Sequence, residues 1–259
     1  MPRALLALLA LLALAAGLVA CGDDPDGGGG GGDDPAAVAA RAVKATQSAD
    51  SYRVAVKLDS DLGGQELFAE GEGVSSADQS RGYFEMDFAV GGAEPAPVVM
   101  ITDGGENFMK GGPFEELLPA GKTWLKVDDA TASTMTPAEF IEFLRESENI
   151  EDAGSEQVRG KDTVHLRGPL DFKKLAENTD SATAKRFAQM PQIEEIDATI
   201  DVWVDKGDDR IARMKLAMSH PDATGSMKVD ADILEYDVPL DKAKAPPAGE
   251  VAEAQGLGG

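Results

Sequence analysis

The sequence has little cysteine, histidine and positive charge, and each shortage excludes a class of protein. Its 259 residues include one Cys and two His, so an intrachain disulfide framework and a Cys₄ or Cys₂His₂ zinc site are excluded. Lys and Arg number 24 against 47 Asp and Glu, which gives a formal net charge of −23. Nucleic acids attract basic surfaces, so we expect no nucleic-acid partner. Two His leave almost no room for a histidine-rich metal centre, and we expect no cofactor.

The chain opens on an apolar run that is too short to span a bilayer comfortably. Arg3 precedes residues 4–18, which are only Ala, Leu and Gly, whereas a transmembrane helix needs about 20 apolar residues. A positive start, a short apolar run and small residues are typical of a secretory signal. The single Cys, Cys21, follows Leu18-Val19-Ala20, and this pattern resembles the bacterial lipobox. An ordinary signal peptide with a chance Cys is the alternative.

The lipobox reading divides the N-terminal region into two parts. Residues 1–20 are predicted to be a lipoprotein signal peptide, and Cys21 the first mature residue, which carries a diacylglycerol on its sulfur and palmitate-type acylation. Residues 21–34 contain six consecutive Gly and five Asp, so we predict a flexible acidic tether. More than one acyl chain makes such an anchor stable. The expected location is the extracytoplasmic face of the cell membrane.

Between residues 35 and 239 we predict one domain of strands and three helical stretches. Asp34-Pro35 supplies an N-cap and a first-turn proline for a helix that ends near Ser48. The Thr136–Glu139 segment is a capping box for a second helix, and residues 171–189 are predicted to form a third. The Pro- and Gly-rich residues 240–259 are predicted to be a disordered tail.

Alternation of apolar and polar residues predicts the strands, with turns between them at Gly63-Gly64 and residues 78–81. The predicted strands are 52–58, 83–90, 97–102, 107–110, 122–127, 162–170, 196–205, 211–218 and 227–234. The last three are long, sequential and antiparallel. The fold class is therefore α+β: a large curved antiparallel sheet, an incomplete β-barrel, with helices across its concave face. Pattern alone leaves open whether that face is an open groove or a filled core.

The search for a catalytic motif is negative. The sequence has no G-x-S-x-G, H-E-x-x-H, S-x-x-K or phosphate-binding glycine loop after a strand. His165 alternates with apolar neighbours on a predicted strand and is expected at the surface, and His220 precedes Pro221 in a turn. Neither has an adjacent Ser nucleophile. We therefore expect no enzymatic activity, no catalytic residues and no metal.

Several short motifs occur in an order that resembles a known family. Cys21 and the acidic tether are followed by a helix that leads into a strand, then by Asn107–Gly112 and Thr123–Val127, and finally by Asp201–Asp205 before Arg210–Arg213. This order is similar to the LppX/LprAFG family of actinobacterial lipoproteins, which shares a fold with the LolA/LolB type of lipoprotein carriers and receptors. The resemblance covers residues 35–239 and implies an incomplete barrel that holds acyl chains in its concavity.

The resemblance implies a function in lipid binding and lipid transport. The expected partners are a lipid or glycolipid ligand and the membrane reached through the anchor, while any membrane transporter partner stays unidentified. The alternative is a non-carrier lipoprotein on the same scaffold that acts as a regulatory or cell-wall interaction module. Inward parity of the strands predicts the residues that line the groove: Val54, Val56, Leu58, Phe84, Met86, Phe88, Ile200, Val202, Met214, Leu216, Met227 and Val229.

The position of Cys21 generates the first testable prediction. Replacing the sulfur (Cys21→Ala) removes the atom to which diacylglycerol is attached, so the variant is expected in the soluble fraction or the medium. Fractionation of membranes followed by immunoblotting checks this, with Ser48→Ala as a matched control outside the lipobox. A Cys21→Ala variant that stays in the membrane fraction to the same extent as the wild type contradicts the anchor.

Overall fold

The computed structural model describes residues 34–62, 64–127, 143–144, 149–171, 174, 177, 196–220 and 225–253, and all structural statements below concern these residues. In chain order the elements are α2 (Pro35–Gln47), β1 (Ser51–Leu62), β2 (Gln65–Ser76), β3 (Arg81–Val90), β4 (Ala96–Asp103), β5 (Glu106–Gly111), η2 (Gly112–Leu117), β6 (Trp124–Val127), β7 (Glu151–Val158), β8 (Lys161–Pro169), β9 (Asp197–Asp205), β10 (Ile211–Ser219), β11 (Gly225–Tyr236), η4 (Ala248–Glu250) and β12 (Val251–Glu253).

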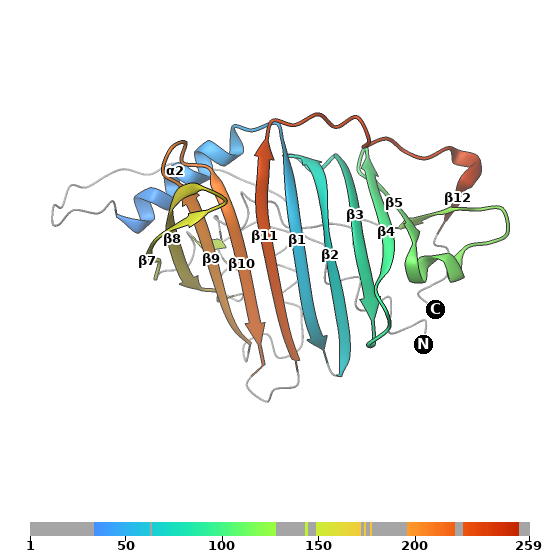
Figure 1. Ribbon diagram of the computed structural model, residues 1–259, viewed down its shortest axis with the longest axis horizontal. Coiled ribbons are helices and arrows are strands. Elements are labelled where there is room, and N and C mark those ends of the chain that lie inside the picture. Colours follow the sequence, from blue (N-terminus) through green and yellow to red (C-terminus); the bar gives the residue numbers. More distant parts are fainter. Residues whose placement is uncertain are drawn as a thin grey trace.

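Helix α2 begins as its sequence predicts. The side chain of Asp34 accepts a hydrogen bond from the Ala36 amide at 3.3 Å, and Pro35 occupies the first turn. Both features satisfy or remove backbone donors that a helix N-terminus leaves without intrahelical partners. The buried stripe of the helix joins the main hydrophobic core. Arg41 pairs with Asp209 in the β9–β10 turn, and Figure 1 shows the helix beside the ends of β8 to β10.

The strands form one open sheet in the order β12-β6-β5-β4-β3-β2-β1-β11-β10-β9-β8-β7. All pairings are antiparallel except that of β12 with β6. Two local meanders, β1 to β6 and β7 to β11, meet where β1 pairs with β11 (Figure 1). The predicted class, a large curved antiparallel sheet of the incomplete-barrel type, is confirmed.

Strand alternation gives the sheet two faces of different chemistry. Inward residues of neighbouring strands align in continuous rows, because the ladder keeps register across the sheet. One such row is Leu166, Val202, Met214, Ala231, Val56, Gly71, Met86 and Val98. We call this side the concave face, and the opposite side, which carries the charged residues, the convex face.

The second and third predicted helices, at Thr136–Glu139 and at 171–189, fall largely outside the described residues. Of these stretches, Phe143 and Leu144 are helical and buried in the main core, and residues 174 and 177 are helical and exposed. In the described part of the chain, no helix has the length and apolar content that a bilayer crossing requires.

The predicted disordered tail is wrong for residues 240–253. We call residues 237–253 the C-terminal strap, because the segment runs along one end of the sheet to its far edge (Figure 1). The Arg81 side chain donates to the carbonyls of Leu240 (3.0 Å) and Ala243 (3.1 Å). The strap ends in β12 on the edge of β6. Its Val251 packs on the convex apolar cluster of Ile101, Phe108 and Trp124.

Arg81 is therefore expected to hold the strap. Arg81→Ala removes hydrogen bonds to two carbonyls and is expected to lower the free energy of unfolding by about 1–3 kcal/mol. Hydrogen exchange at the amides of residues 240–253 is expected to become faster. Arg53→Ala is the control, since the exposed Arg53 only approaches Glu235 at 4.0 Å. Unchanged exchange in the strap of Arg81→Ala contradicts this role.

Candidate functional site

The concave face carries the main hydrophobic cluster of the described structure, and its central strands have no charged side chain at inward positions. Its inward residues on β1 to β4 and β8 to β11 are Val, Ile, Leu, Phe, Met, Ala and Gly, with a few hydroxyl-bearing residues at the strand ends. Residues from both meanders join one hydrophobic cluster. Such a surface can bury an apolar molecule, and the inward positions of its central strands carry no carboxylate, imidazole or amine for acid–base chemistry.

All twelve residues predicted to line a groove lie on the concave face and in this cluster. Their exposure divides them into two sets. Eight are buried: Val54, Leu58, Phe88, Ile200, Val202, Met214, Leu216 and Met227. Four keep part of their surface exposed: Val56, Phe84, Met86 and Val229. The strand pattern could place these residues on one face, but their exposure depends on what covers the face.

Cover over the concave face is uneven. The β9 and β10 side chains are almost fully buried, as Val202 shows with 0% exposure, and they share a cluster with the apolar stripe of α2. On the other meander, Phe114 of η2 packs against Phe88 with ring centroids 5.9 Å apart. The partly exposed Val56 and Val229 lie on β1 and β11, between these two regions in the strand order, and Met86 lies on β3, the strand that also carries Phe88.

Strand β2 has small residues at the centre of this region. A Cβ on Gly73 would lie 2.2 Å from Cδ1 of Phe84, and a Cβ on Gly71 would lie 2.6 Å from Cβ of Met86. The Phe84 ring therefore occupies the space above Gly73, and the backbone of Glu85 and Met86 crowds Gly71, so no larger residue fits at either position without displacing them. The absence of a side chain at Gly73 allows the phenylalanine to lie over β2, and its absence at Gly71 allows the close approach of the β3 backbone.

Sequence reasoning missed part of the face. It named no strand between the turns at residues 63–64 and 78–81, where β2 lies, because Gly71 and Gly73 interrupt the apolar alternation. It also omitted Met100 and Met109, which belong to the same cluster. Within the predicted strands 97–102 and 107–110, alternation places both methionines on the inward side, so the sequence pattern could have identified them. With Met86, Met214, Met218 and Met227, they bring the methionines of the cluster to six of the nine in the chain.

Two tyrosines, Tyr52 and Tyr236, are register partners in this cluster near the α2 end. Burial raises the pKa of the Tyr236 hydroxyl well above its ordinary value of about 10, because the phenolate loses solvation. The hydroxyl donates to the Ile211 carbonyl at 2.9 Å, and the Arg210 guanidinium stacks over the ring. Tyr236 therefore stays neutral in the physiological range and contributes packing to this end of the face.

The convex face carries the charge as cross-strand pairs. Arg167 pairs with Asp201 at 2.7 Å and Lys215 with Asp230 at 2.9 Å, while Arg213 binds Asp232 through two nitrogens. Opposite charges on adjacent strands stabilise a sheet modestly and are screened by salt. The outward-facing residues of these strands thus form a solvated surface of paired charges.

His165 lies on the convex face as predicted, but it is largely buried, with 12% of its side chain exposed. Its ring stacks on Trp203 at 4.1 Å, and Nε2 lies 2.5 Å from an Asp201 oxygen. Its Nδ1 faces Glu156 at 3.8 Å. A His–Asp pair alone does not perform acyl transfer, which needs a hydroxyl or thiol at the other ring nitrogen. In the described residues that side faces a carboxylate instead.

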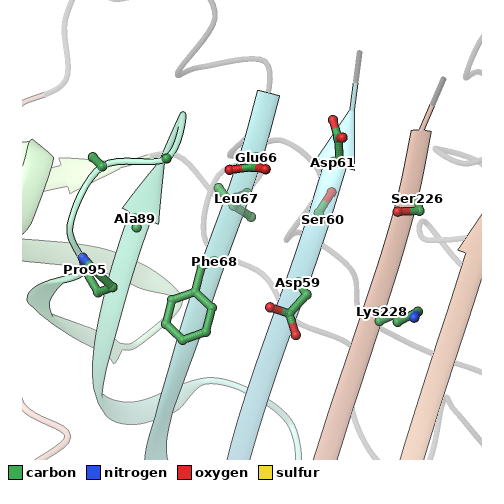
Figure 2. Close-up of a pocket in the computed structure, with 12 residues that line it drawn as sticks. Asp59, Ser60, Asp61, Glu66, Leu67, Phe68, Ala89, Pro95, Ser226 and Lys228 are labelled. Atoms are coloured by element: carbon green, nitrogen blue, oxygen red, sulfur yellow. The ribbon is translucent and has the colours of Figure 1, made fainter. Parts of the chain in front are cut away.

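A hollow of about 390 Å³ lies on the convex face beside the β1–β2 hairpin (Figure 2). Asp59, Asp61 and Glu66 line it together with one cation, Lys228, and with the apolar ring of Phe68. Its net negative charge disfavours an anionic lipid head group. Within the described ranges no group of three or more His, Cys, Asp or Glu has the arrangement of a metal site.

Comparison with known proteins supports the fold. No protein-family model and no curated protein matches the sequence. LprF from Mycobacterium bovis superposes with a TM-score of 0.52 at 13% identity, covering 82% of this chain and 97% of LprF. Lipoprotein LppX from Mycobacterium tuberculosis gives 0.48 at 15% identity, with 80% and 98% covered. A LolA superfamily protein from Nitrosomonas europaea gives 0.34 at 10% identity, with 81% and 96% covered. The chain therefore has a fold similar to that of LprF.

Proposed function

We propose that the protein is a membrane-anchored envelope lipoprotein that binds the acyl chains of a lipid or glycolipid on its concave face and carries or presents that lipid. The observation that carries this proposal is the half-exposed apolar set Val56, Phe84, Met86 and Val229 on an uncharged face. Exposed apolar surface of this kind in a soluble domain is typical of a ligand or partner site.

The energetics of such a site need no catalytic group. Each buried CH₂ contributes about 0.8 kcal/mol, so an acyl chain gains affinity simply by covering these side chains. Methionine suits a surface that accepts chains of varied shape, because its side chain is unbranched and polarisable. The six methionines in the core cluster support this interpretation. The role we propose is binding and transfer, without an enzymatic step.

The N-terminal features complete the proposal. Cys21 and residues 22–33 of the tether lie outside the described residues, and we propose that they attach the domain to the extracytoplasmic face of the cell membrane. The similarity in fold to LprF supports the envelope assignment. The acidic convex face keeps the domain from binding anionic lipid head groups by charge, so membrane attachment rests on the anchor.

The packed half of the concave face favours a second function. Eight of the twelve predicted lining residues are buried, and the β9 and β10 set has almost no exposure. This observation supports the alternative of a non-carrier lipoprotein, in which the same scaffold has a filled core and acts as a regulatory or cell-wall interaction module. The two functions differ in whether purified protein retains lipid.

Two tryptophan substitutions separate these functions. In the half-exposed region, Val56→Trp is expected to displace co-purified lipid while changing the free energy of unfolding by less than about 1 kcal/mol. In the packed region, Val202→Trp is expected to overpack and cost about 1–3 kcal/mol or more. Native mass spectrometry and thermal unfolding of an anchor-free form that begins at Gly22 measure both effects.

The matched control is Ala55→Trp, which adds the same ring to the next residue of β1, on the convex face. It is expected to leave bound lipid unchanged. Absence of lipid from the wild type, combined with a large loss of stability in Val56→Trp, would sink the carrier proposal and favour the packed lipoprotein.

A further inference from the structure

A few polar side chains interrupt the apolar concave face, and most have partners. The Ser75 hydroxyl donates to the Ser76 carbonyl at 3.0 Å, and the Thr102 hydroxyl donates to the Asn107 side chain at 2.8 Å. Ser60 differs from these. Its hydroxyl oxygen is shielded from solvent and has no hydrogen-bond partner in the described structure. Buried polar atoms are nearly always paired, so an unpaired one requires an explanation.

Ser60 occupies the inward position of β1 that precedes Leu62, the last residue of the strand before the hairpin. Its register partners are Met227 on β11 and Leu67 on β2, both buried and apolar. The side chain as a whole is 8% exposed. The convex hollow also touches Ser60, but the hydroxyl is closed to solvent there. The hydroxyl is therefore directed into the apolar interior, at the hairpin end of the concave face.

The pattern of β1 makes this hydroxyl unfavourable for stability alone. The preceding inward residues are Tyr52, Val54, Val56 and Leu58, and an alanine at position 60 would continue the series without an unpaired group. A buried hydroxyl that makes no hydrogen bond loses its hydration and gains nothing in exchange. A ligand that brings an acceptor to this point would restore the missing hydrogen bond.

We propose that the Ser60 hydroxyl donates a hydrogen bond to a carbonyl oxygen at the head of the bound acyl chain. This inference rests on the proposed function and adds an orientation to it. The carbonyl lies at the β1–β2 hairpin end, and the chain runs along β1 past the half-exposed Val56 and Val229 toward α2. From Ser60 to Tyr52 the strand extends about 27 Å, which is long enough for an extended fatty-acyl chain.

Local charge selects an ester over a free carboxylate. Asp59, Asp61 and Glu66 surround this end of the sheet on the convex side, and no described cationic side chain shares the inward parity of Ser60. A carboxylate next to Ser60 would be desolvated without a counter-charge, which is costly. An ester carbonyl accepts the same hydrogen bond without charge. The substrate class is therefore an acyl ester, as in a glycerolipid or an acylated glycolipid.

The test compares three probes of matched length: methyl laurate, laurate and tetradecane. Each displaces a fluorescent apolar dye from the full-length protein held in amphipol. The wild type is expected to bind methyl laurate more tightly than tetradecane by about three- to tenfold, the effect of one neutral hydrogen bond, and to bind laurate less tightly than the ester. Ser60→Ala is expected to lose the preference for the ester and to keep the affinity for tetradecane.

Two further variants separate this role from packing. Ser60→Thr keeps the hydroxyl and is expected to restore the ester preference. Ser75→Ala removes a hydroxyl that already has a partner, so it is expected to lower the thermal midpoint by about 2–4 °C and to leave the ester preference intact. Ser60→Ala is expected to keep or raise the midpoint, because it removes an unpaired group.

The outcomes are distinct. If no probe displaces the dye from the wild type, the carrier proposal fails together with this inference. If all three probes bind but Ser60→Ala retains the wild-type preference for the ester, lipid binding stands and the assignment of Ser60 is overturned. Tighter binding of laurate than of methyl laurate by the wild type overturns the choice of an ester.

Discussion

The pairing of β1 with β11 is the constraint on which the rest of the structure depends. Each meander is built from neighbours in the chain, but these two strands lie at opposite ends of the sequence and pair from Tyr52 with Tyr236 to Leu62 with Gly225. Without this ladder the molecule would be two smaller sheets with four edges. With it, inward rows run unbroken from β8 to β5, so the apolar residues of both meanders become one face. Pairing β1 with β11 costs conformational entropy, because the long stretch of chain between them has to close into a loop before the contacts form.

The uneven cover of that face follows from the same geometry. A sheet of twelve strands has a wider inner face than a helix of 13 residues can bury, since neighbouring strands lie about 4.8 Å apart. Helix α2 contacts one meander and η2 the other. Around Val56 and Met86 the face keeps partly exposed apolar side chains, although Val54 and Leu58 on the same strand as Val56 are buried. A central apolar region of this kind is a consequence of sheet width, and lipid binding is the use we propose for it.

Much of the sheet could be predicted from the sequence because its signals are local. Asp34 and Pro35 mark the helix start, and the strict alternation in 196–205, 211–218 and 227–234 marks three strands that the structure confirms. The missed elements lack such signals. Strand β2 has glycines at inward positions, and β7 exposes nearly every residue, so neither shows apolar alternation.

The order of the strap and the exposure of the site residues could not be predicted for a different reason. Both depend on contacts between residues far apart in the chain, and such contacts leave no local pattern in the sequence. The strap reads as disordered from its Pro and Gly content, yet Arg81, far away in sequence, fixes its carbonyls. The parity of Ser60 is visible in the sequence, but the lack of a partner for its hydroxyl depends on residues from β2 and β11 that meet only in the fold. Exposure and hydrogen-bond satisfaction are properties of packing, so strand patterns alone could not separate Val56 from Val202.

An incomplete barrel has two edge strands, and their unpaired backbone groups could form hydrogen bonds with other chains. The structure shows different protection at each edge. Strand β7 carries Glu151, Asp152 and Glu156, and its ladder with β8 is irregular next to Gly154. Charge and a bulge both oppose edge-to-edge pairing. At the other end the strap adds β12, which is only three residues long. The sheet can therefore stay open without pairing through its edges, and an open sheet is what the lipid-binding role that we propose requires.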